Sequence, residues 1–325
     1  MFAAVNFHYI RENYDYPIQA IHGTNPVSFR KQLELLAKEG LFVSQEEVCR
    51  AVTEGYPLPN NSILITFDDG LKEQFDLALP ILQEMGIPAI FFINPYNIIE
   101  SKISLVHQVH LLRSFVPAIE LLSKIDDYGI NINLTSTEKK LAQDHYNYDQ
   151  ESDALLKYFL NFKLQLVFKD SLINQLFQDC FSLDEIEKFH DQYYMDLSMV
   201  TTLDHMGLLG SHTYSHQPLG LLPDIQLFEE FQKANQFFSD YGLTIPKSVS
   251  YPFGNYESCS LRVQEIAEKF NFNFGFTMER AGNQSVVEKP LYLARFDCND
   301  VVGGKSSIFQ TGKMFETMKI GNWKF

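Results

Sequence analysis

Short apolar runs alternate with amphipathic segments along most of this chain, and this alternation limits the folds it can adopt. The runs 62–67 (SILITF) and 88–93 (PAIFFI) are continuous, which predicts strands that are buried on both faces. Helical patterns separate such runs, for example at 26–40 and at 71–85, where Gly86 closes the pattern. Strands and helices in this order form parallel sheets. The sequence therefore predicts an α/β fold, either a barrel or an open sheet.

One long segment interrupts the alternation. Residues 101–200 contain a single glycine, Gly129, and a single proline, Pro117, and their apolar residues recur three and four positions apart. This pattern predicts helices. After residue 205 the alternation resumes, with strand-like runs at 207–211, 247–251, 273–277 and 291–296. We expect one domain over 1–325 with a helical insertion at 101–204.

The charge balance excludes two classes of partner. The chain has 26 Lys and Arg against 41 Asp and Glu, a net charge of -15. Nucleic acids and anionic membranes attract clustered cations, so we expect neither as a partner. No apolar stretch approaches the ~18 residues of a spanning helix, and the N-terminal residues lack the pattern of an export signal. The four cysteines are widely spaced, as in a reduced protein. We expect a cytoplasmic protein without a transmembrane segment.

Chemically active side chains follow two of the predicted strands. Asp68 and Asp69 follow SILITF, and His212 and His216 follow the run at 207–211. In parallel α/β folds the loops after the strand ends build the active site. Each motif alone has an ordinary explanation, because Asp-Asp-Gly is a common turn and histidines four apart also occur on surfaces. Together they supply a three-ligand metal site with a second carboxylate available as a base.

The motifs resemble those of a known family. The segments 66–70 (TFDDG) and 212–216 (HTYSH) are similar to the first two motifs of the polysaccharide deacetylases, the NodB-homology or carbohydrate esterase family 4 proteins. The segment 252–254 (PFG) resembles their third motif. The resemblance covers roughly 1–100 and 205–300 and leaves the helical segment outside. It implies a distorted (β/α) barrel with fewer strands than a full one.

The resemblance also implies a metal and a base. A divalent ion would be held by Asp69, His212 and His216. Zinc is our first expectation for this mixed oxygen and nitrogen set, with nickel, cobalt or iron as alternatives. Asp68 would be the general base that takes a proton from the attacking water.

The third motif would contact the substrate. In the family its backbone N–H stabilises the oxyanion, which assigns this role to Phe253. Tyr251 and Pro252 would line the same side of the site.

Two parts of the family pattern are missing. The arginine that usually begins the third motif is replaced by Ser250. Arg295, at the end of the run LYLARF, is expected at a strand end and would supply the missing guanidinium to Asp68. The alternative is a surface arginine paired with Asp297, and the sequence leaves both open.

The late catalytic histidine of the family is also missing, because no histidine follows His216. The apolar run 3–10 (AAVNFHYI) predicts the first strand. His8 is our first candidate for the general acid, since it lies at the predicted end of this strand. His107 and His110 are weaker candidates. For each of the three, a structural role is the alternative.

We expect a metal-dependent hydrolase that removes an acetyl or formyl group from an amino sugar in the synthesis of a bacterial surface polysaccharide. The acylated sugar could be nucleotide- or lipid-linked. The alternatives are a hydrolase of small non-sugar amides and an inactive carbohydrate-binding protein. The helical segment would cover the site or form a homo-oligomer contact, and Tyr193 and Tyr194 could stack on a sugar ring.

Overall fold

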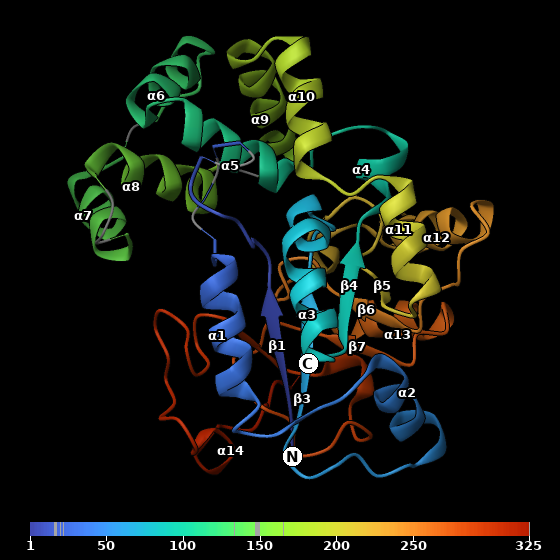
Figure 1. Cartoon of the computed structure of the whole chain (residues 1–325). Helices are drawn as coiled ribbons and strands as arrows, with labels where there is room; N and C mark the ends of the chain where they lie inside the picture. The colour runs from blue at the N-terminus through green and yellow to red at the C-terminus, as the bar shows by residue number, and fades with distance from the viewer. Residues whose placement is uncertain are drawn as a thin grey trace. The chain divides into compact units, whose positions relative to one another are not determined.

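Two compact units make up the chain, whose computed structural model is drawn in Figure 1. The described residues are 1–15, 18–19, 21, 23–132, 134–146, 150–164 and 166–324. The first unit comprises Met1–Asn13, Gly23–Lys102 and Asp191–Phe325, and the second comprises Tyr14–His22 and Ile103–His190. Residues 191–204, which the sequence groups with the insertion, thus lie in the first unit. The single domain over 1–325 and its insertion at 101–204 stay a prediction.

A parallel sheet forms the centre of the first unit. Among the described residues it has eight strands, in the order β7-β6-β5-β4-β3-β1-β8, with β2 beside β3. An isolated parallel bridge between Phe276 and Leu293 brings the β7 edge close to the start of β8. The sheet therefore forms a nearly closed barrel, which confirms the predicted fold class. The strand bounds are Phe2–Phe7 (β1), Leu41–Phe42 (β2), Ser62–Phe67 (β3), Ala89–Ile93 (β4), Leu209–Ser211 (β5), Ser248–Ser250 (β6), Phe274–Phe276 (β7) and Arg295–Asp297 (β8).

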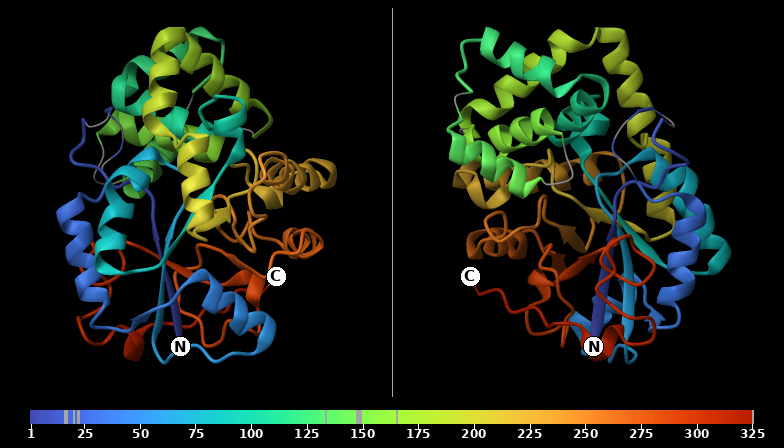
Figure 2. Two further views of the ribbon diagram at one scale, coloured as in Figure 1. Left: turned by 45° about the vertical axis from the view of Figure 1, so that its right-hand side comes forward. Right: turned by 90° about the vertical axis from the view of Figure 1, so that its left-hand side faces the viewer.

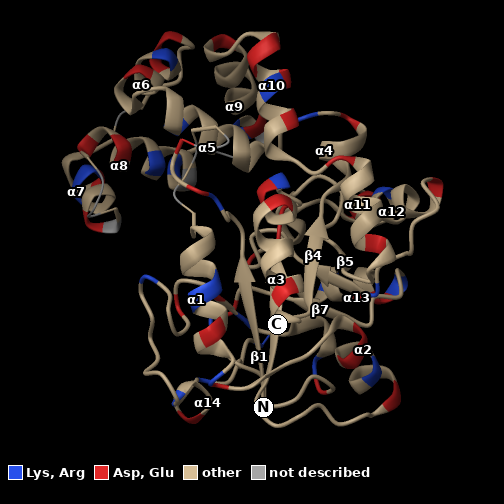
Figure 3. Ribbon diagram, in the orientation of Figure 1, with Lys and Arg blue, Asp and Glu red and all other residues tan. Residues whose placement is uncertain are grey.

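Burial on both faces explains the continuous apolar runs. On the helix side, the rings of Phe67 and Phe91 stack 4.7 Å apart, and Phe7 lies 5.6 Å from Phe67. On the opposite side, a second cluster of buried residues includes Ala4, Leu64, Ile90, Phe92, Phe274 and Phe276. Figure 3 shows β1 and β4 without charged residues, whereas α1 and α2 carry both signs. These strands follow the predicted runs because neither face meets water.

Capping residues mark several helix ends of the first unit, although α1 ends at Leu36 and not at Gly40 as predicted. Asn25 caps the helix that starts with Pro26, Ser44 and Glu47 form a capping box, and Gly86 ends its helix with φ 64°. The bounds are Pro26–Leu36 (α1), Gln45–Glu54 (α2), Leu79–Met85 (α3), Pro95–Ile99 (α4), Leu197–His205 (α11), Asp224–Asp240 (α12), Leu261–Lys269 (α13) and Met314–Thr317 (α14). The two views of Figure 2 show the chain starting at the foot of β1.

Two further elements differ from the sequence prediction. The helix expected over 71–85 begins with a π-helical turn at Gln74–Ala78, where the N–H of Leu79 reaches the carbonyl of Gln74. Pro80 follows directly and has no N–H to donate, which disfavours a regular α-helical turn there. The run at 291–296 also shortens, because Pro290–Tyr292 form a 3₁₀ turn. Arg295 therefore begins β8, and its predicted place at a strand end is wrong.

The second unit is helical in the residues that the structure describes. Its helices are Leu105–Phe115 (α5), Ala118–Asp127 (α6), Ser136–His145 (α7), Glu151–Tyr158 (α8), Phe159–Lys163 (π-helical), Leu166–Cys180 (α9) and Leu183–Tyr193 (α10), the last extending into the first unit. The rings of Phe115, Phe181 and Phe189 meet at 5.1 to 5.8 Å and pack three of these helical segments together. Over the described part of the chain, no helix has the length and apolar character to cross a membrane.

The packing of β5 against β4 can be tested at Gly210. A Cβ added there would lie 2.3 Å from the ring of Phe92 and 2.8 Å from Ile90. We expect Gly210→Ala to lower the free energy of unfolding by about 1–3 kcal/mol in urea denaturation, because the ring must move. The control is Ile225→Ala, at a residue of α12 that is 75% exposed. It should change the free energy of unfolding by less than about 0.5 kcal/mol. Equal stability of Gly210→Ala and the wild type would contradict this packing.

Candidate metal centre and active site

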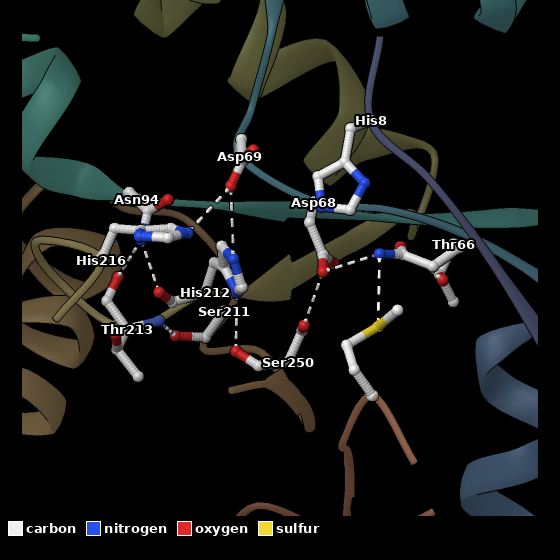
Figure 4. A network of polar contacts seen from close by, with 12 residues as sticks. His8, Thr66, Asp68, Asp69, Asn94, Ser211, His212, Thr213, His216 and Ser250 are labelled. Atoms are coloured by element: carbon white, nitrogen blue, oxygen red, sulfur yellow. Dashed lines mark hydrogen bonds and ion pairs between the residues drawn. The ribbon is translucent and has the colours of Figure 1, made fainter. Parts of the chain in front are cut away.

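Polar side chains gather at the carboxyl ends of the central strands, as Figure 4 shows. His8 follows β1, Asp68 and Asp69 follow β3, Asn94 follows β4, and His212 follows β5. Because these strands are parallel neighbours, residues far apart in the sequence meet at one end of the barrel.

Asp69, His212 and His216 form a cluster that could hold a metal. The Oδ1 atom of Asp69 lies 3.4 Å from Nε2 of His212 and 3.3 Å from Nε2 of His216. One ligand atom from each residue lies within 4.8 Å of the others. One carboxylate oxygen and two imidazole nitrogens suit a divalent ion and leave positions for water and substrate. This donor set therefore fits the metal that the sequence predicts.

A second contact fixes the ring of His212. Its Nδ1 lies 2.7 Å from the backbone carbonyl of Ser250. A carbonyl can only accept, so Nδ1 donates and the lone pair of the neutral ring resides on Nε2. Contacts of this kind orient metal-binding histidines. The barrel thus aims Nε2 toward Asp69.

A tight loop brings the second histidine back to the first. Thr213 (φ 57°) and His216 (φ 61°) both have left-handed backbones. Asn94 Nδ2 donates to the carbonyl of His212 at 2.5 Å, and the N–H of Tyr96 donates to the carbonyl of Tyr214 at 3.1 Å. Asn94 was not predicted as a site residue. It directly follows an apolar run, however, and the same position identified Asp68.

Asp68 lies in a buried polar network beside this cluster. It is 3% exposed. Arg295 donates to both carboxylate oxygens, at 2.9 and 2.8 Å, and Asn6 Nδ2 and Ser250 Oγ each donate to Oδ2 at 3.0 Å. Burial alone would raise the pKa of Asp68, but the charges of Arg295 and His212 outweigh it and lower the pKa to about 2.

Arg295 is fully buried, and its guanidinium pairs with Asp68 rather than with Asp297. The guanidinium carbon lies 5.5 Å from the ring centre of Phe276 and 6.0 Å from that of Phe92. Its Nη2 also donates to Ser250 Oγ at 2.8 Å. The structure therefore excludes the alternative of a surface arginine. Ser250 stands where the family motif has arginine. Its hydroxyl connects the guanidinium of Arg295 to the carboxylate of Asp68.

The other histidine candidates lie in different places. His8 is partly exposed and close enough for its charge to lower the pKa of Asp68. Figure 4 shows its ring beside that carboxylate. His107 and His110 lie in α5 of the second unit, with ring centres 5.8 Å apart. Of the three, His8 is the one that the structure brings to the first unit's polar cluster.

The third motif places an aromatic ring beside the metal cluster. Phe253 has φ 61°, is 46% exposed, and its ring centre lies 4.9 Å from that of His216. Pro252 precedes it and is buried. The side chain of Tyr251 is fully buried in a hydrophobic cluster, so only its backbone can line the site.

Tyr193 and Tyr194 are each 4% exposed. The hydroxyls of Tyr193 and Tyr9 lie 2.6 Å apart, and Tyr194 forms an antiparallel bridge with Leu71. The suggestion that these two tyrosines stack on a sugar is therefore wrong, because both rings are used in packing.

Comparisons with known proteins agree with this geometry. The family model described as "Polysaccharide deacetylase" matches residues 55–157, which include Asp68 and Asp69. No curated protein sequence matches the chain.

Several solved structures share the fold. IcaB from Ammonifex degensii is similar with a TM-score of 0.51 and 16% identity, covering 91% of this chain and 90% of that one. A de-N-acetylase from Aggregatibacter actinomycetemcomitans has a TM-score of 0.52 and 13% identity, and the match covers 94% of this chain and 97% of that one. The BpsB deacetylase domain from Bordetella bronchiseptica has a TM-score of 0.50 and 13% identity, and the match covers 91% of this chain and 95% of that one. At these identities the likeness shows the fold alone. The family match thus covers the segment with the first motif, and the solved structures share the fold over most of the chain.

Proposed function

We propose that this protein is a metal-dependent N-deacylase that removes an acetyl or formyl group from an amino sugar of a bacterial surface polysaccharide. The observation that supports the proposal is that two adjacent carboxylates have different partners. Asp69 faces two histidines, and Asp68 is ion-paired with Arg295. The acylated sugar as substrate and zinc as the metal rest on the family and on the donor set. A nucleotide- or lipid-linked acceptor, a cytoplasmic location and a homo-oligomeric state stay predictions of the sequence.

The metal would be held by Asp69, His212 and His216. When bound, a divalent ion lowers the pKa of a coordinated water toward about 7 and polarises the amide carbonyl. Asp68, kept ionised by Arg295, accepts the proton of the attacking water. The backbone N–H of Phe253 donates to the oxyanion.

Amide hydrolysis also needs a proton for the leaving amine, and we propose His8 as its donor. The bond between the carbonyl carbon and nitrogen breaks, the acyl group leaves as a carboxylic acid, and the amine takes up the proton. Asp68 and His8 thereby act as base and acid on one substrate. The buried Arg295 is a positioning residue, because it acts through the carboxylate of Asp68.

Metal removal tests the reaction class. We expect purified protein to release acetate or formate from N-acylated amino-sugar oligomers, to lose this activity with chelator, and to regain it with zinc. Asp68→Asn should bind zinc stoichiometrically but turn over at least about 100-fold more slowly, because the base is lost while Asp69, His212 and His216 are unchanged. Release from small amides alone would favour the non-sugar hydrolase. Bound zinc without any release would favour the inactive binding protein, and full activity without metal would contradict the metal site.

The role of His8 can be tested through the pH dependence of turnover. A general acid must carry its proton, so the wild-type rate should fall at alkaline pH, where the acid has lost it. His8→Gln should be slower by about 100-fold or more and should lack this fall. His205→Gln, at an exposed position of α11, is the matched control and should keep the wild-type profile. A fall that persists in His8→Gln would remove His8 from the role.

The ion pair of Asp68 also predicts how stability depends on pH. The folded-state pKa of about 2 lies below the unfolded value, so the ionised carboxylate stabilises the fold above about pH 4, and this contribution is lost as the pH falls toward 2. In urea unfolding, the stability difference between wild type and Asp68→Asn should shrink by about 1 kcal/mol per pH unit below pH 4. Asp76→Asn, at an exposed ion pair with Lys72, should show no comparable change. A constant difference for Asp68→Asn would contradict the depressed pKa.

A further inference from the structure

A buried carboxylate outside the proposed chemistry contacts the loop that carries both histidines. Glu230 lies in α12 and is 7% exposed. Its neighbour Glu229 is exposed and pairs with Lys233 at 3.6 Å. Of these two adjacent acids, Glu229 therefore faces solvent, whereas Glu230 faces the loop 212–216.

Glu230 accepts three hydrogen bonds from this loop. Its Oε2 accepts the N–H of Tyr214 at 3.1 Å and the N–H of Ser215 at 2.9 Å, and its Oε1 accepts the hydroxyl of Ser215. Successive backbone N–H groups that converge on one anion form a strong, geometrically specific contact. The carboxylate therefore fixes the middle of the loop, between His212 and His216.

The loop needs such a contact because its backbone is in a disfavoured conformation. Thr213 and His216 both have φ near 60°, a region that side-chain-bearing residues seldom occupy. Asn94 and Tyr96 hold the carbonyls of the loop, and Glu230 holds its N–H groups. With both sets of groups bound, the loop keeps the turn that returns His216 to within 3.3 Å of Asp69.

We infer that Glu230 is a positioning residue for the metal centre. It acts through Tyr214 and Ser215 and pre-organises the imidazoles of His212 and His216 before the ion binds. The inference rests on the proposed function, since it requires that a metal binds to these histidines.

Zinc binding to the metal-free protein tests this role without substrate. We expect Glu230→Ala to bind zinc about 10- to 100-fold more weakly in competition with a chromophoric chelator, because the loop loses its anchor. Glu229→Ala is the matched control and should bind zinc like the wild type. Glu230→Gln keeps an oxygen for the two N–H groups and should lose less affinity than Glu230→Ala.

A purely structural role would give another result. In that case Glu230→Ala would lower the melting temperature of the metal-free protein, but its zinc affinity, measured well below that temperature, would equal that of the wild type. This result would overturn the inference. If Glu230→Ala fails to fold, Ser215→Ala and Glu230→Gln carry the test. Each substitution should weaken zinc binding. The fold-loss of zinc affinity in the double variant should be smaller than the product of the fold-losses in the two single variants, because both substitutions disturb one contact. A wild type that binds no zinc would overturn the proposed function and this inference together.

Discussion

The buried ion pair between Asp68 and Arg295 is the interaction on which the inside of the barrel depends. It connects the end of β3 to the start of β8, and Asn6 of β1 and Ser250 of β6 bond to the same carboxylate. A buried charge without its partner costs several kcal/mol, so neither residue can be replaced alone without consequence. The pair and its hydrogen bonds therefore link four strands inside the barrel.

The left-handed backbone at Asp69 separates the two carboxylates. With φ 79° at Asp69 and 61° at Gly70, the chain turns sharply after β3. Asp68 consequently points toward Arg295, whereas Asp69 points toward the two histidines. Two identical side chains, adjacent in the sequence, thus have different surroundings, and the difference supports their proposed roles as base and metal ligand.

Much of the fold and part of the site could be predicted from the sequence. The apolar runs at β3 and β4 and the helix end at Gly86 depend on local patterns and on burial, which the sequence shows directly. The Asp-Asp-Gly and histidine motifs were identified because residues after parallel strands converge. One prediction failed locally, because a 3₁₀ turn at Pro290–Tyr292 shortened β8. Another failed because tertiary packing buried Tyr193 and Tyr194.

The sequence by itself determined that strands buried on both faces would form a parallel α/β fold, as a barrel or an open sheet, and that carboxylates and imidazoles would follow their ends. Only the tertiary structure decided which side chains meet there. Arg295 reaches Asp68 across 227 positions, and Glu230 reaches the histidine loop from a helix that the motif does not include. The reason is that hydrophobic periodicity depends on local spacing, whereas an ion pair or a hydrogen bond depends on distances that barrel closure alone sets.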